Sequence, residues 1–170
     1  MTIFIKVIIA AGAFGVSLYF GVKTSRKYAA RELYFAEIVQ FCNGLTGEIG
    51  FKHAVLAEIF DKYSMSFKSL LSAQLRAAGE IVDEGGVIDE AALRAKLPRG
   101  TLKGEEYDNV VLFFNGLGKS DGETQIGSAA GFKDVFSTSL EQARADRRKY
   151  GPLYWKLGLL GAFAFVIVII

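Results

Sequence analysis

The chain has 170 residues and a formal net charge of +2, which is too small to indicate a nucleic-acid-binding protein. Apolar residues make up 51%, and the excess lies at the two ends. A single cysteine, Cys42, excludes an intrachain disulfide, and the presence of only two prolines favours helix over sheet. About 125 residues remain between the apolar ends, which suits one compact domain.

The first apolar run covers residues 3–22 and is interrupted only by Lys6. At about 1.5 Å per residue it spans roughly 30 Å, the thickness of the hydrocarbon core of a bilayer. A cleaved signal peptide is the alternative, but its positive charges would precede the apolar core, whereas here they follow it. We therefore predict a transmembrane helix over residues 3–22.

The second apolar run covers residues 153–170 and is interrupted only by Lys156. It is roughly 27 Å long, enough to cross a bilayer if the Lys156 ammonium reaches the interface. Tyr154 and Trp155 stand where an interfacial aromatic belt is expected. The alternative is a helix packed in a protein core, but we predict a second transmembrane helix.

Basic residues follow the first run and precede the second, so both clusters face the middle of the chain. They are Lys23, Arg26, Lys27, Arg31, Arg144, Arg147, Arg148 and Lys149. The positive-inside rule then places a domain over residues 23–150 in the cytoplasm and both termini outside.

In the middle domain, apolar residues recur at helical spacing, and no segment alternates with a period of two. A first stripe predicts a helix that continues from the first run to a turn near residues 47–50; its members are Tyr34, Ile38, Phe41, Leu45 and Ile49. Further helices are predicted over about 51–62, 66–80, 89–96 and 103–117, and from about 120 into the second run, with Asp89 as an N-cap. We predict an all-α fold, an antiparallel helical bundle between an N-terminal and a C-terminal transmembrane helix.

Residues 79–108 hold eight acidic and four basic side chains. One interpretation is a surface that meets a cytosolic partner, and the other is a set of solvated loops.

No enzyme is predicted from the inventory of reactive side chains. Gly118-Lys119-Ser120 resembles the end of a phosphate-binding loop, but Phe113 stands where that motif needs a glycine. Cys42 and His53 are the only cysteine and the only histidine, too few for a zinc site, and Cys42 on a helical stripe is predicted to be buried. We therefore predict no catalytic, cofactor-binding or metal-binding residue, no cofactor and no small-molecule substrate.

The segment from Phe114 to Gln125 carries a short motif, Leu117-Gly118 followed by Asp121 and Gln125. It resembles the signature of the stage III sporulation protein AB family of endospore-forming bacteria, and the order of the two apolar ends and the chain length agree. From the residues alone, Gly118 permits a turn and Asp121 is placed to cap the next helix, and a contact with a partner is the alternative role for the four residues. Gly122, Gly127 and Gly131 either leave the start of this helix uncertain or mark a close approach of helices.

The resemblance implies a function beyond these patterns. Members belong to the complex that links mother cell and forespore, and their soluble part is similar to the cytoplasmic domain of the inner-membrane platform proteins of type II secretion and type IV pilus machines. The expected partners are a secretion-type ATPase, stage III sporulation protein AA, and other stage III sporulation membrane proteins in an oligomeric complex. The expected location is the mother-cell membrane around the forespore. The alternative is a platform or adaptor protein of another secretion, pilus or signalling system.

Overall fold

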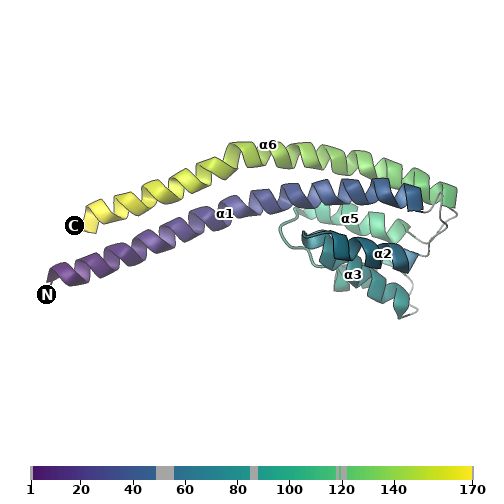
Figure 1. Ribbon diagram of the computed structural model, residues 1–170, viewed down its shortest axis with the longest axis horizontal. Helices are drawn as coiled ribbons and strands as arrows, with labels where there is room; N and C mark the ends of the chain where they lie inside the picture. Colours follow the sequence, from purple (N-terminus) through teal and green to yellow (C-terminus); the bar gives the residue numbers. More distant parts are fainter. Residues whose placement is uncertain (1, 49–55, 85–87, 118, 120–121, 170) are drawn as a thin grey trace. The chain divides into compact units, whose positions relative to one another are not determined.

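The computed structural model describes residues 2–48, 56–84, 88–117, 119 and 122–169. These residues form six α-helices and no strand, so the predicted all-α class is confirmed (Figure 1). The helices are α1 (Thr2–Gly47), α2 (Leu56–Ser66), α3 (Leu70–Asp83), α4 (Glu90–Lys96), α5 (Gly104–Gly116) and α6 (Gly122–Ile169).

The chain divides into two compact units, which we describe separately. The terminal unit consists of Met1–Glu32 and Gln142–Ile170, and the middle unit consists of Leu33–Glu141. In the described part of the chain, no helix combines the length and the apolar character needed to cross a membrane. The predicted spans over 3–22 and 153–170 are thus not confirmed and stay predictions.

Side-chain caps explain where the short helices of the middle unit begin. Asp89 is the N-cap of α4, as predicted, and its Oδ1 accepts a hydrogen bond from the Ala92 N–H at 2.7 Å. The Glu106 carboxylate accepts from the Lys103 N–H at 2.9 Å at the start of α5. α3 begins after Ser69 rather than at residue 66, because the Ser69 hydroxyl accepts from the Leu71 N–H and caps the helix.

The predicted boundaries are otherwise displaced by a few residues. α2 ends at Ser66 instead of residue 62, and the part of the predicted helix before residue 56 lies outside the described residues. α5 covers residues 104–116 against the predicted 103–117. α1 ends at Gly47, where the turn was predicted.

A cluster of phenylalanines forms the core of the middle unit. Phe113 lies at its centre, with its ring centroid 5.5 Å from those of Phe114 and Phe136 and 6.1 Å from that of Phe41. All four side chains are buried. The predicted stripe on α1 is confirmed for its described members, because Tyr34, Ile38, Phe41 and Leu45 are all buried, and Ile49 lies outside the described residues.

Several polar side chains are also buried in the middle unit, and three of them, Tyr34, Glu37 and Gln74, join separate segments. The Tyr34 hydroxyl donates to Gln74 Oε1 at 2.7 Å, and Gln74 Nε2 donates to the Pro98 carbonyl at 2.9 Å. The carboxylate of Glu37, which is 8% exposed, accepts from the backbone N–H groups of Lys68 and Ser69, each at 3.0 Å. Glu37 thereby joins α1 to the start of α3.

In the terminal unit, the first part of α1 and the last part of α6 lie side by side and run in opposite directions (Figure 1). α6 continues through Pro152, so the helix predicted from about residue 120 runs into the second apolar run, as predicted. Gly127 and Gly131 lie inside α6, which begins at Gly122, so the predicted uncertainty about the helix start is resolved.

Candidate functional site

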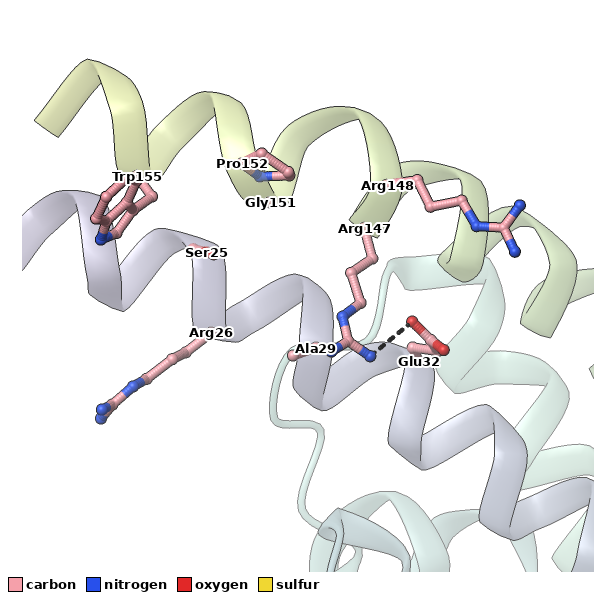
Figure 2. A pocket seen from close by; sticks show the side chains of 9 residues that line it. All are labelled: Ser25, Arg26, Ala29, Glu32, Arg147, Arg148, Gly151, Pro152 and Trp155. Atoms are coloured by element: carbon pink, nitrogen blue, oxygen red, sulfur yellow. Dashed lines mark hydrogen bonds and ion pairs between the residues drawn. The ribbon is translucent and has the colours of Figure 1, made fainter.

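The terminal unit contains a groove of about 590 Å³ lined by α1 and α6 (Figure 2). Five of its lining residues, Arg26, Glu32, Arg147, Arg148 and Trp155, carry the charges and the single indole. The groove brings together three of the eight predicted basic flanks, one from α1 and two from α6.

Two ion pairs join the helices at this point. The buried Arg31 guanidinium donates to Asp146 Oδ2 at 2.7 Å, and Arg147 donates to Glu32 Oε2 at 3.1 Å. The predicted flanks therefore include two residues, Arg31 and Arg147, that hold the helix pair together. These two cations are not free surface charges, because each has a carboxylate partner on the opposite helix.

Each helix carries a base next to an acid at this point, Arg31-Glu32 on α1 and Asp146-Arg147 on α6. A count of net charge does not register these adjacent opposite charges, which supply the two ion pairs. The partner residues Asp146 and Glu32 were not among the predicted site residues.

The other flank residues are mostly solvent-facing. Lys23 Nζ lies 5.5 Å from the centroid of the Tyr19 ring, and Lys149 Nζ lies 5.1 Å from that of Tyr150, both within the range of a cation–π contact. Lys27, Arg26 and Arg148 are exposed.

Small residues let the two helices approach closely beyond the groove. A Cβ on Gly21 would lie 2.8 Å from the Tyr154 carbonyl oxygen and 3.0 Å from the Gly158 Cα. The Ser17 hydroxyl donates to the Gly158 carbonyl at 3.0 Å. This is the backbone approach that small residues at four-residue spacing, such as Ser17 and Gly21, permit between helices.

A tyrosine cluster lies between the glycine contact and the ion pairs. The Tyr28 ring stacks on those of Tyr150 and Tyr154, with centroid distances of 5.6 and 5.9 Å. Aromatic rings in this offset arrangement add to the energy of the buried apolar area.

The sequence matches the family described as stage III sporulation protein AB over residues 6–170, nearly the whole chain. The chain belongs to the stage III sporulation protein AB family. No curated protein and no solved structure matches it.

The motif that carried the resemblance to the stage III sporulation protein AB family falls in the middle unit. Leu117 is buried and forms the C-cap of α5, with its N–H donating to the Phe114 carbonyl at 3.1 Å. Gln125 is half-buried in the first turns of α6. Gly118 and Asp121 lie outside the described residues, so the predicted turn and cap there stay predictions.

Several acids of the segment 79–108 have partners within the chain. Glu84 pairs with Lys96 at 2.7 Å, and Arg94 pairs with both Glu90 and Asp108, at 2.9 and 2.7 Å. These ion pairs occupy some of the acids within the chain, and the two interpretations of this segment, a partner surface or solvated loops, both stay predictions.

Cys42 is buried, and burial raises the pKa of its thiol to about 12, so the thiolate needed for nucleophilic attack is scarce at neutral pH. Among the described residues, no group of three His, Cys, Asp or Glu side chains could hold a metal ion. His53 lies outside them.

Proposed function

We propose that this chain is a non-enzymatic platform subunit of the stage III sporulation membrane complex. In this proposal its terminal unit anchors it in the membrane, with the middle unit in the mother-cell cytoplasm. The middle unit docks a secretion-type ATPase. Membership in the stage III sporulation protein AB family supports the place of the chain in sporulation.

The observation that carries the anchor is the apolar surface of the terminal unit. Ten large apolar side chains of this unit are 44–77% exposed, among them Ile8, Phe20, Leu160 and Ile167. Large apolar side chains left exposed in this number indicate a protein or membrane interface. Trp155 and the tyrosine cluster lie where the basic flanks meet the apolar runs, and membrane proteins concentrate their interfacial aromatic residues at such positions.

The close contact at Gly21 and Gly158 also supports a membrane location. In lipid there is no hydrophobic driving force between helices, so association depends on close packing of small residues and on interhelical hydrogen bonds. The terminal unit has both, since Ser17 also donates across the contact.

Cysteine accessibility in intact sporulating cells tests the topology. A Cys42→Ala background removes the only native thiol. In that background we expect Met65→Cys, at a side chain 72% exposed in the middle unit, to react with a membrane-impermeant maleimide only after lysis. A cysteine added after Ile170 should react before lysis in wall-stripped cells taken before engulfment is complete, while the space between the two membranes is still open to the medium. Labelling of Met65→Cys before lysis would show that the middle unit is not cytoplasmic.

Co-purification tests the docking. Full-length chain extracted from membranes of sporulating cells should retain the stage III sporulation ATPase, and an unrelated two-span membrane protein extracted in parallel should not. Repeated absence of the ATPase from the bound fraction, with the middle unit intact by protease resistance, would refute the docking role.

A further inference from the structure

We infer that the groove between α1 and α6 binds the phosphate group of an anionic phospholipid, and this inference rests on the proposed membrane anchor. The groove lies in the terminal unit and is lined by Ser25, Arg26, Arg147, Arg148 and Trp155, among others (Figure 2). Its chemistry combines cations, a hydroxyl and an indole, which is the set that a lipid headgroup with its adjoining glycerol requires.

The three arginines of the groove differ in whether they form an ion pair within the chain. Arg147 reaches across the groove to Glu32, as the dashed line in Figure 2 shows, so its charge is balanced within the chain. Arg26 and Arg148 make no ion pair within the part of the chain that the structure describes, and both are exposed. One lies on each wall of the groove, α1 and α6 respectively.

These two guanidinium groups extend outward from the groove walls in Figure 2. Since neither is fixed by a partner, each can rotate about its methylene stem toward an anion in the groove. A guanidinium forms two parallel hydrogen bonds to phosphate oxygens, so two of them from opposite walls can hold one phosphate bidentately.

The position of the groove along the chain favours a lipid over a free phosphate ion. It contains Pro152 and Trp155 at the start of the second apolar run, and its α1 wall begins three residues after the first run ends. A phosphate held there by arginine would leave its acyl chains beside the exposed Leu157 and Phe20. Basic pockets between membrane helices on the cytoplasmic side are known binding sites for anionic headgroups.

Trp155 is the only tryptophan of the chain and lines the groove, so its fluorescence reports on the lipid there. The full chain is reconstituted into phosphatidylcholine nanodiscs that contain a minor fraction of a brominated lipid, either phosphatidylglycerol or phosphatidylcholine. Bromine quenches tryptophan at short range. We expect brominated phosphatidylglycerol to quench Trp155 more than brominated phosphatidylcholine at the same mole fraction.

The variants separate a groove from general surface charge. Arg26→Gln with Arg148→Gln removes the two uncommitted groove cations, and Lys27→Gln with Lys149→Gln removes the same charge from the adjacent residues, which do not line the groove. Through general surface charge alone, each cation contributes about fivefold, so either double variant should lower the relative affinity for phosphatidylglycerol by up to about 25-fold. The groove predicts that the arginine double variant lowers this affinity by at least about tenfold more than the lysine double variant, because its guanidinium groups also lose their hydrogen bonds to the phosphate. An equal loss of affinity in the two double variants would refute the proposal that the groove binds the headgroup.

Two further measurements distinguish a bound lipid from a bound phosphate ion, and show whether the terminal unit enters the membrane at all. Inorganic phosphate, added at matched ionic strength, should leave the quenching unchanged; if it abolishes the preference, the site recognises free phosphate and the lipid assignment is wrong. An unchanged Trp155 emission maximum in pure phosphatidylcholine shows that a variant is folded. If neither brominated lipid quenches Trp155, the membrane anchor itself fails, whereas equal quenching by both lipids leaves the anchor standing and refutes the headgroup site.

Discussion

Truncation of the Glu37 side chain should lower the free energy of unfolding of the middle unit. Its carboxylate is 8% exposed and accepts two backbone hydrogen bonds at 3.0 Å, from Lys68 and from the N-cap residue Ser69 of α3. A negative charge at this end of a helix also interacts favourably with the helix dipole. Glu37 thus fixes the start of α3 to α1.

The cost of removing Glu37 can be estimated from these contacts. Hydrogen bonds to a charged group contribute about 1.5–3 kcal/mol each, and the two N–H groups left behind are only partly buried, so water can replace some of the loss. We expect Glu37→Ala to lower the free energy of unfolding of the middle unit by about 3 kcal/mol. Glu37→Gln keeps one acceptor oxygen and should cost about half as much.

Cys42 supplies the assay, because it is the only thiol and is 1% exposed in the middle unit. The full chain in detergent is equilibrated in increasing urea and pulsed with a thiol reagent, and the labelled fraction gives the unfolding midpoint of that unit. Glu80→Ala, an exposed acid on α3, is the control and should shift the free energy by less than about 0.5 kcal/mol. If Glu37→Ala and Glu80→Ala unfold at the same urea concentration, the hydrogen bonds of Glu37 contribute nothing and the argument fails.

Three further predictions concern close packing, backbone conformation and pH. Gly21→Ala should destabilise the terminal unit by about 1–3 kcal/mol, measured by Trp155 fluorescence in urea, because its Cβ would lie 2.8 Å from a backbone oxygen of α6; Gly15→Ala, with nothing within 4 Å, should be neutral or stabilising. Gly100→Ala should destabilise the middle unit by at least about 1 kcal/mol in the thiol assay, since Gly100 has a φ of +54° and its Cβ would meet a leucine methyl at 2.6 Å; an unchanged midpoint would contradict both reasons. Because burial raises the pKa of Cys42 from 9.0 to about 12, the unfolded chain loses this proton first, so stability is complete below pH 9 and declines as the pH rises through 12. The free energy of unfolding, measured by protease resistance, should therefore fall between pH 8 and pH 10 by about 1.4 kcal/mol more in the wild type than in Cys42→Ala. Parallel curves for the two would exclude the buried thiol as the cause.

The sequence was sufficient for the helices because their signals are local. Asp89 caps α4 as its spacing predicts, and the apolar stripe on α1 faces the core. The displaced start of α3 was not predictable in the same way. Ser66 and Ser69 are both plausible caps by residue type, and the choice depends on Glu37, which lies more than thirty residues earlier in the chain.

The roles of the glycines in the helices were also not predictable from local sequence. Gly44 lies inside α1, which continues to Gly47 although glycine has a low helix propensity. A Cβ on Gly44 would overlap the Tyr63 hydroxyl oxygen, so the absence of a side chain makes room for an aromatic ring from α2. Gly127 and Gly131 have no neighbour within 4 Å of a Cβ among the described residues, so a close approach of helices does not explain them there. Intrinsic propensity is identical at these positions, and only the tertiary neighbour distinguishes them.

The basic flanks illustrate why a count of charges cannot identify a site. All eight residues contribute equally to the positive-inside argument, which depends only on number and sign. The structure gives them unequal roles, since Arg31 and Arg147 are bound to Asp146 and Glu32 and stabilise the helix pair. Arginines without such a partner are the ones available to an external anion. A search for lipid-binding residues in the stage III sporulation protein AB family should therefore begin by pairing each flanking base with an acid on the opposite helix, and examine the bases that are left.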